Sequence, residues 1–296
     1  MGDGPGSLLA RRLAQLYDLP PRELVRRLRR RLRGGAPVID DLLAEPKNMR
    51  AQRPYDFLSR YEAILARTIG WRPLDFAGRR VMELGCGPML GWGPLALYRG
   101  AAAFVAVEPA FVPGVLDDPR VVEGYLLPLH KDLTAIYGPL MDFAVWRAAL
   151  AGRVELHRCP LLDLPDMVPV DVVLSNSCLE HIFPLAESLR RLAALQAPDC
   201  RFLHLVDFGN HHSTRRPFHD IYRLEPEDYW RIHGREINLV RWPAMLEVFA
   251  AAGLPARFVP YGVMPELADQ APEAAWCRGL TDDVLWTKTG LVVSAT

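Results

Sequence analysis

Glu83-Leu84-Gly85-Cys86-Gly87-Pro88-Met89-Leu90-Gly91-Trp92-Gly93 is the most informative stretch of this 296-residue sequence. It follows a short apolar run, Val81 to Leu84, and it leads into Pro94, a residue suited to the first turn of a helix. Glycines at such a corner let the backbone turn tightly and approach a ligand with no side chain in the way. The stretch therefore predicts a strand, a ligand-binding loop and a helix.

The spacing of the glycines and of one later carboxylate indicates which kind of ligand this loop binds. Glu108 ends the next predicted strand, about twenty residues on, where a carboxylate can accept both hydrogen bonds of a ribose diol. Against the dinucleotide fingerprint G-x-G-x-x-G, the third glycine, Gly91, comes one residue late. Gly87, Gly91 and Gly93 have the loop spacing of short-chain dehydrogenases, but no tyrosine is followed four residues later by a lysine. A phosphate-binding P-loop is excluded because the chain has no Gly-Lys pair.

An acidic residue, Glu83, stands on the strand directly before the loop. A carboxylate in this place suits a cationic ligand better than a pyrophosphate, because opposite charges attract. The sulfonium and amino groups of S-adenosylmethionine make such a ligand, and we expect this cofactor to bind here.

Short apolar runs alternate with helical patterns from Arg79 onward, which predicts an α/β fold built on a doubly wound, mostly parallel seven-stranded sheet. The expected strands are residues 81–84, 104–107, 154–156, 170–175, 201–206, 257–261 and 291–293. The clearest expected helices are 185–195 and 244–252. Three long connections, about 109–153, 208–243 and 262–289, are expected to be inserts such as lids or binding loops.

Residues 1–70 are expected to form an N-terminal helical, arginine-rich extension, and residues 71–296 the main domain. Leucines recur at helical spacing over 9–16 and 24–32, with arginines between them. The favoured interpretation is a solvated helical face, and weak contact with an anionic membrane surface is the alternative. A further helix over 55–68 carries an apolar stripe, Phe57, Tyr61, Leu65 and Ile69, widened by Leu58 and Ile64, and should pack on the domain that follows.

Three segments together resemble the class I S-adenosylmethionine-dependent methyltransferases: Glu83-x-Gly85-x-Gly87, Glu108, and Asp171-Val-Val-Leu-Ser-Asn-Ser-Cys-Leu-Glu-His181. The Leu179-Glu180-His181 turn after the fourth strand is typical of the small-molecule branch of that family. The resemblance covers about 78–260 and implies a Rossmann-like methyltransferase fold.

The resemblance also implies roles for individual residues. Gly85, Cys86 and Gly87 form the loop that approaches the cofactor, and Glu83 helps to hold its amino-acid end. Glu108 binds the ribose hydroxyls, and Asn176 and Ser177 line the methionine end. The family usually places an aspartate near the adenine after the third strand. The register gives Pro160 here, so Asp163 or a backbone group is expected to take over that contact.

Methyl transfer to a hydroxyl benefits from a general base, and histidine is the usual base near neutral pH. The candidates are His181, after the fourth strand, and His211 and His212, after the fifth. All three are expected at the carboxyl edge of the sheet, where ligands bind in open α/β folds. For His181 a structural role in the turn is the favoured interpretation.

The 208–243 insert mixes aromatic residues with arginines and leaves two interpretations open. It is either a lid that grips an anionic or sugar-like acceptor or a packed segment with a charged exterior. The residues concerned are Phe218, Tyr222, Tyr229 and Trp230, with Arg215, Arg216, Arg223, Arg231 and Arg235.

The predicted function is methyl transfer to a small-molecule or glycan acceptor, with oxygen as the favoured atom by family analogy. A non-catalytic cofactor-binding module is the first alternative. A metal enzyme that uses His204, Asp207, His211 and His219 is a weaker one, because its ligands lack tight metal-site spacing, and no metal site is predicted.

Bulk composition is that of an ordinary globular protein. The 35 basic and 35 acidic side chains cancel, so no overall charge attracts nucleic acid, and the part beyond the N-terminal arginines is net acidic. The five cysteines are widely spaced without a C-x-x-C pair, which favours a reducing, cytoplasmic location over a disulfide framework. Peripheral contact with a membrane is the alternative location, and the sequence gives no oligomeric state.

Overall fold

A computed structural model describes residues 38–211, 215–268 and 270–295 and contains a single seven-stranded sheet. All seven predicted strands are confirmed, and β5 and β7 extend further than their apolar runs. The strands are β1 Arg80–Leu84, β2 Ala103–Val107, β3 Val154–His157, β4 Val170–Asn176, β5 Gln196–Asp207, β6 Ala256–Val263 and β7 Thr287–Ser294. The two N-terminal leucine repeats and His212 lie outside the described residues.

The strand order β3-β2-β1-β4-β5-β7-β6 places β1 and β4 side by side in the middle of the sheet. The first five strands are parallel and β7 is antiparallel to both of its neighbours, so the predicted doubly wound sheet is confirmed. Leu84 pairs with Val107 on one side and Ser175 on the other. The chain winds outward in opposite directions from this point, which is where open α/β sheets bind ligands.

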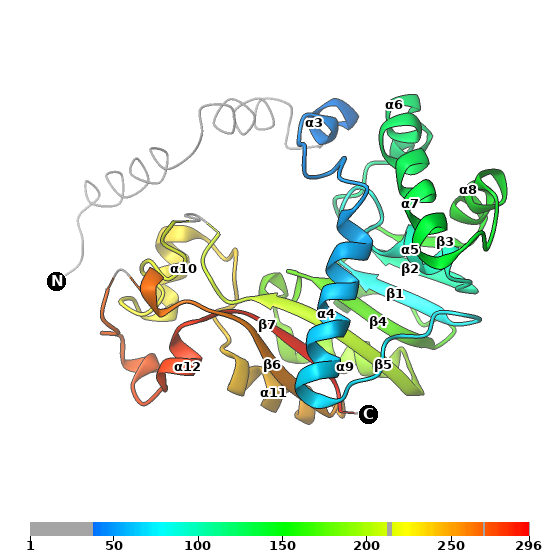
Figure 1. The fold of residues 1–296 in the computed structure, drawn as a ribbon. Helices are drawn as coiled ribbons and strands as arrows, with labels where there is room; N and C mark the ends of the chain where they lie inside the picture. Colours follow the sequence, from blue (N-terminus) through cyan, green and yellow to red (C-terminus); the bar gives the residue numbers. More distant parts are fainter. Residues whose placement is uncertain (1–37, 212–214, 269, 296) are drawn as a thin grey trace.

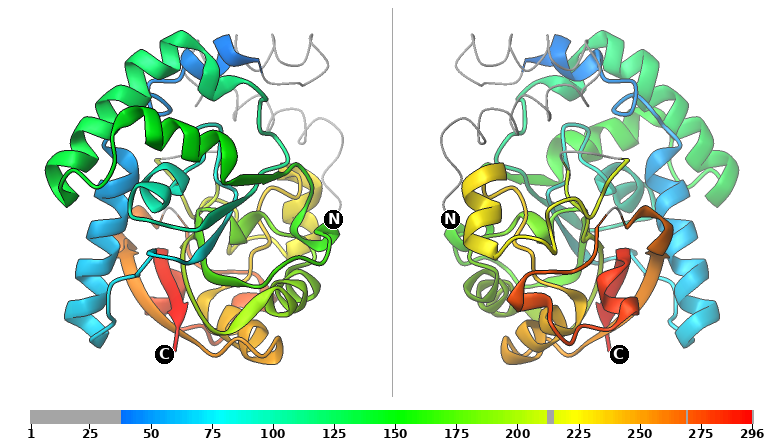
Figure 2. Two further views of the ribbon diagram at one scale, coloured as in Figure 1. Left: turned by 90° about the vertical axis from the view of Figure 1, so that its right-hand side faces the viewer. Right: turned by 90° about the vertical axis from the view of Figure 1, so that its left-hand side faces the viewer.

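Helices cover both faces of the sheet, as Figures 1 and 2 show. Val81, Ala106 and Leu203 share one core with α4, α5, α7 and α8, whereas Met82 and Phe202 pack on the other face with α9 and α11. Successive strand residues face opposite sides, which accounts for this division. The helices are α3 Ile39–Leu43, α4 Arg53–Ile69, α5 Gly93–Tyr98, α6 Pro119–Val121, α7 Leu127–Tyr137, α8 Phe143–Gly152, α9 Leu185–Ala194, α10 Pro226–His233, α11 Trp242–Ala251 and α12 Asp282–Leu285.

Helix α4 crosses the sheet in front of β4 and β5 in Figure 1 and belongs to the main core. It has a proline in its first turn and ends at Gly70, whose positive φ of 66° suits glycine. Leu58, Tyr61 and Leu65 are buried, while Phe57 and Ile69 are only partly buried. The predicted packing of this helix is confirmed, with Leu58 in a more central place than the stripe suggested.

The three long connections are packed segments rather than open loops. The 109–153 segment forms α6, a π-helical turn at Val122–Leu126, α7 and α8, and Trp146 is completely buried. The 208–243 and 262–289 segments share a third, smaller core, formed among others by Phe218, Tyr222 and Tyr229. Burial of these rings favours the packed-segment interpretation of the 208–243 insert, because a completely buried ring has no surface to offer an acceptor.

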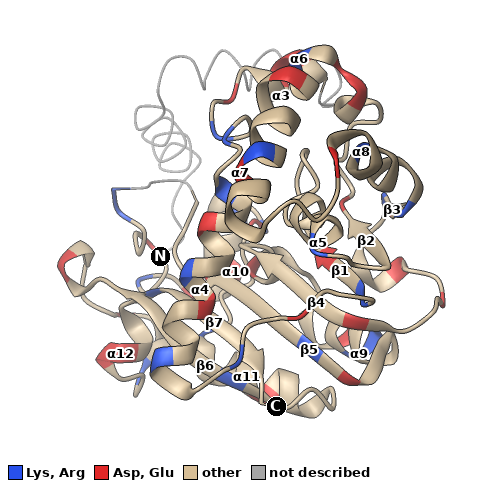
Figure 3. Cartoon of the chain, turned by 45° about the vertical axis from the view of Figure 1, so that its right-hand side comes forward, with Lys and Arg blue, Asp and Glu red and all other residues tan. Residues whose placement is uncertain are grey.

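Acidic and basic residues are both scattered over the described elements in the view of Figure 3. Within the described ranges no helix is long and apolar enough to span a bilayer.

Leu65→Ala should destabilise the protein by about 2–5 kcal/mol, because it opens a cavity at a completely buried position between α4 and the sheet. The matched control is Ile136→Ala on α7, where the side chain is 51% exposed and the expected change stays within about 0.5 kcal/mol. Urea unfolding of both variants measures the difference. Equal stabilities would show that α4 does not contribute to the core.

Candidate active site

The corner after β1 is built from glycines that the local geometry requires. Gly85 and Gly87 have φ values of 66° and 68°, in the left-handed region that favours glycine. A Cβ on Gly85 would lie 2.8 Å from Cys178 Sγ, so a side chain there would displace the start of the turn after β4. The Gly85 N–H donates to the Val107 carbonyl at 2.8 Å, which ties the corner to β2.

Glu108 directly follows β2 and faces the corner. One carboxylate oxygen accepts the Gly87 N–H at 2.9 Å and the other accepts the Ala110 N–H at 3.0 Å. Each carboxylate oxygen has a second lone pair that stays available to a ligand hydroxyl. The residue predicted to bind a ribose therefore also holds the glycine loop in place.

Glu83 is a buried carboxyl group beneath the loop. Its Oε2 accepts the Trp92 N–H at 2.7 Å, and its side chain fills the space beside Gly91. A Cβ on Gly91 would lie 2.2 Å from Glu83 Oε1. Burial raises the pKa of Glu83 to about 8, and the charge of Glu108 contributes to that rise. A nearby cation would compensate the cost of this buried charge.

The end of β4 lies next to the corner. Ser177 has a φ of 54°, a strained conformation for a residue other than glycine, and its N–H donates to the Leu205 carbonyl at 2.9 Å. Asn176 Oδ1 accepts the Tyr61 hydroxyl of α4 at 3.3 Å. The strain marks a turn that the surrounding structure holds in one shape.

Two clefts meet at Gly85 and together form a site for an elongated ligand. The first, about 580 Å³, has Glu83, Cys86, Gly87 and Asn176 in its wall. The second, about 1090 Å³, has Glu108, Ser177 and His181 in its wall. Other residues of the second cleft are Val107, Cys159, Pro160, Leu161, Leu162, Cys178, Ile182 and Phe183, which make it mainly apolar.

Three basic residues that the sequence analysis missed line the first cleft: Lys47, Arg50 and Arg53. They lie immediately before and at the start of α4, which places positive charge opposite Glu83. Arg53 also stacks over the Phe57 ring, with its guanidinium carbon 5.3 Å from the ring centroid. The sequence contained one sign of this role: the three basic residues are spaced three apart, just before an apolar helix.

Two of the predicted cofactor residues differ from the rest. Cys86 lines the first cleft, but its thiol is buried and its pKa is raised well above the ordinary value by that burial, so it is no nucleophile. Asp163 is exposed at the end of a 3₁₀ turn, Leu161–Asp163, and the lining of the second cleft includes Pro160, Leu161 and Leu162 but not Asp163. The adenine contact expected of Asp163 stays a prediction without geometric support.

Two of the three predicted histidines meet at the edge of the site. The rings of His181 and His211 lie edge to face, with centroids 4.7 Å apart. His211 Nε2 lies 4.0 Å from Asp207 Oδ2, and Lys288 Nζ pairs with that same carboxylate oxygen at 2.7 Å. Burial, together with the charge of His181, lowers the pKa of His211, which keeps its imidazole neutral near pH 7.

The metal-enzyme set of His204, Asp207, His211 and His219 is wrong as a single site. His204 is completely buried within the sheet, and its Nδ1 is hydrogen-bonded to the Ser175 hydroxyl at 2.8 Å. Its side chain packs against Phe202 and Phe249 on the α9–α11 face. His219 Nε2 lies 3.7 Å from Asp220, another carboxylate altogether. Alternation along β5 turns His204 inward, away from His211.

No protein-family model and no curated protein matches the sequence. Among solved structures, an O-methyltransferase family protein from Burkholderia thailandensis is 17% identical, with a TM-score of 0.43, and the match covers 83% of this chain. This chain spans only 56% of the length of that protein. An S-adenosylmethionine-dependent methyltransferase from Mesorhizobium loti is 14% identical over 80% of this chain and 96% of its own, with a TM-score of 0.42.

The third structure is the 1,6-didemethyltoxoflavin-N1-methyltransferase from Burkholderia thailandensis, with 1,6-didemethyltoxoflavin and S-adenosylhomocysteine bound. It is 19% identical over 93% of this chain and 89% of its own, with a TM-score of 0.39. All three TM-scores are below 0.5.

Glu83→Gln should become more stable relative to the wild type as the pH rises from 5 to 8.5. The folded chain holds the Glu83 proton up to about pH 8, whereas the unfolded chain releases it near pH 4.3. This carboxyl therefore contributes stability at low pH that is lost as the pH rises through 8, and glutamine removes the loss while its oxygen still accepts the Trp92 N–H. Urea unfolding at pH 5 and at pH 8.5 measures the difference in the free energy of unfolding between variant and wild type. Glu247→Gln, at an exposed position, is the control. A pH-independent difference would contradict the burial of this charge.

Proposed function

We propose that the chain binds S-adenosylmethionine at the glycine corner and transfers its methyl group to an oxygen of a small-molecule or glycan acceptor. The observation that carries this proposal is the corner itself, where bare backbone at Gly85 and Gly87 lies between the carboxylates of Glu83 and Glu108. A ligand that combines a cationic centre with a ribose fits both groups at once, because a cation beside Glu83 favours loss of its proton and Glu108 accepts the ribose hydroxyls.

The charges of the first cleft fit an amino acid. Glu83 is an acceptor for an ammonium group, and Lys47, Arg50 and Arg53 offer cations for a carboxylate. Arginine pairs well with carboxylates because its planar guanidinium donates two parallel hydrogen bonds. A zwitterionic amino-acid end is complementary to this arrangement.

The second cleft fits an adenosine. Glu108 faces it with lone pairs for the ribose hydroxyls, and Leu161, Ile182 and Phe183 supply apolar walls for a purine ring. Gly85 lines both clefts, so the sulfur that joins the two halves of the cofactor would lie against bare backbone.

When bound, S-adenosylmethionine supplies an electrophilic methyl group, and the acceptor oxygen–methyl bond forms as the sulfur–methyl bond breaks to leave S-adenosylhomocysteine. The protein aligns the acceptor with the methyl group and excludes water. The acceptor hydroxyl is placed beside His181 and His211, where a neutral imidazole can take its proton. His181 is the histidine that lines the second cleft.

A non-catalytic cofactor-binding module is the second candidate, because such a module would need the same cofactor pocket as an enzyme. Turnover of S-adenosylmethionine with a labelled methyl group in the presence of a cell extract separates the two. Incorporation of label into a small molecule supports the enzyme, and binding without incorporation supports the module.

A thermal-shift panel of S-adenosylmethionine, S-adenosylhomocysteine and NADPH tests the choice of cofactor directly. A ligand that binds the native state raises the melting temperature with the logarithm of its saturation. We expect both adenosyl compounds to raise it and NADPH to leave it unchanged. Stabilisation by NADPH alone would overturn the proposal in favour of a dinucleotide enzyme.

Glu108→Ala should weaken binding of S-adenosylhomocysteine by about 1.5–3 kcal/mol, the loss expected for charge-assisted hydrogen bonds to the ribose. Part of the loss also reflects a loosened loop, because Glu108 accepts the Gly87 N–H. Titration calorimetry measures it, and Glu247→Ala on the exposed side of α11 is the control. Unchanged affinity in Glu108→Ala would remove this residue from the site.

A further inference from the structure

We propose that Glu180, His181 and His211 form a binding site for one divalent transition-metal ion beside the second cleft, which His181 lines. The sequence analysis predicted no metal site. The three proposed ligands come from two segments that lie thirty residues apart in the chain. The turn after β4, Leu179–His181, supplies two of them, and the segment after β5 supplies the third.

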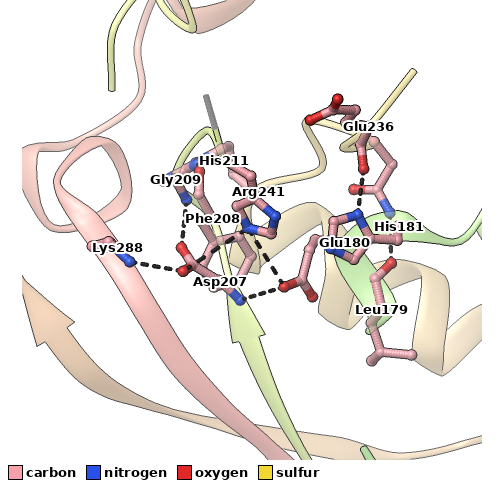
Figure 4. Close-up of polar contacts among 11 residues, drawn as sticks. Leu179, Glu180, His181, Asp207, Phe208, Gly209, His211, Glu236, Arg241 and Lys288 are labelled. Carbon is pink, nitrogen blue, oxygen red and sulfur yellow. Dashed lines mark hydrogen bonds and ion pairs between the residues drawn. The ribbon is translucent and has the colours of Figure 1, made fainter. Parts of the chain in front are cut away.

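The three side chains converge in the described structure. One potential ligand atom from each lies within 4.8 Å of the others, and His211 Nε2 lies 4.0 Å from Glu180 Oε1. An ion about 2.1 Å from each of three tetrahedrally arranged donors holds them about 3.4 Å apart, so the side chains must move together by up to about 1.4 Å to complete the site. Figure 4 shows the Glu180 carboxylate pointing toward His211, with the His181 ring beside it.

Glu180 carries a second, independent sign of a missing ligand. Its side chain is only 3% exposed, and its Oε2 atom is buried without a hydrogen-bond partner among the described residues. The other oxygen, Oε1, accepts the Asp207 N–H at 3.3 Å. A buried carboxylate oxygen without a partner is costly, and a bound cation removes that cost.

The neighbours of these residues orient them as the neighbours of metal ligands do. His181 Nδ1 is hydrogen-bonded to the Glu236 carbonyl, so Nδ1 carries the proton and Nε2 keeps a lone pair for an ion. Asn238 fixes the turn: its N–H donates to the Glu180 carbonyl at 2.7 Å, and its side-chain amide donates to Leu179 at 2.8 Å. Lys288 neutralises the adjacent Asp207, which leaves Glu180 as the carboxylate available to the ion.

Two imidazoles and one carboxylate suit Zn²⁺, Mn²⁺ or Fe²⁺ rather than Ca²⁺ or Mg²⁺, which prefer oxygen ligands alone. Three protein ligands leave further coordination positions open. His181 lines the second cleft, so those positions face the place where the acceptor hydroxyl is expected, a role that rests on the proposed function. An ion there would lower the pKa of a bound hydroxyl, whose proton would then leave to solvent. With the ion bound, the two imidazoles would act as ligands, and the ion would take over from them the activation of the acceptor hydroxyl.

The test uses the full-length chain after removal of metal with a chelator, titrated with Zn²⁺ alone by calorimetry. We expect one ion per chain in the wild type and at least a tenfold loss of affinity in Glu180→Gln and in His211→Gln. His219→Gln, at a histidine outside the cluster, is the matched control and should bind as the wild type does. Visible absorption of the Co²⁺-loaded wild type gives a readout that needs no variant, because protein ligands change the spectrum of the aqueous ion.

Three outcomes would overturn the site: no binding by the wild type, unchanged affinity in Glu180→Gln, or loss of binding in His219→Gln. Affinity for S-adenosylhomocysteine, measured without metal, is tested in parallel and also shows that each variant is folded. Zn²⁺ binding without S-adenosylhomocysteine binding would refute the proposed methyl transfer and leave the metal site standing. The reverse result would refute the metal site alone.

Discussion

The contact between bare backbone at Gly85 and the turn after β4 is the constraint on which the rest of the site depends. β1 and β4 pair in the centre of the sheet, so their carboxyl ends emerge side by side. Only a residue without a Cβ fits at this corner, because Cys178 Sγ already occupies the space. The two clefts meet at Gly85, which adds no side chain of its own between them. Glu83, Glu108 and the end of β4 all take their positions from this junction.

Much of the fold was predictable from the sequence because β1, β2, β4, β5 and β7 are largely buried, whereas β3 and β6 are more exposed. A buried parallel strand shows as a short continuous apolar run, and each of the seven runs is a strand of the sheet. Glu83, Gly85, Gly87 and Glu108 were predictable for a related reason: their roles are local to the ends of two adjacent strands, and their spacing in the sequence is the spacing of the corner.

The residues that sequence reasoning missed or misplaced depend on contacts between distant segments. Arg53 reaches the first cleft because α4 packs across the sheet, and Glu180 meets His211 because β4 and β5 are neighbours. The second contact has no signature in the linear sequence, and the first has only the three-residue spacing of Lys47, Arg50 and Arg53 ahead of α4. His204, in contrast, could have been placed correctly from the sequence. Alternation along β5 puts it on the same face of the sheet as Phe202 and Val206, away from the carboxyl edge where the site lies. The rings of the 208–243 insert resembled a binding surface because a small, separate core uses the same aromatic residues as a lid.

A crystal structure of the full chain with S-adenosylhomocysteine tests the central claim most directly. The account predicts the ribose hydroxyls within hydrogen-bond distance of Glu108, the sulfur against Gly85, and the amino-acid carboxylate beside Arg53. It also predicts the adenine between Leu161 and Phe183. A ligand bound away from Gly85, or a corner closed by side chains with Glu108 turned to solvent, would contradict it.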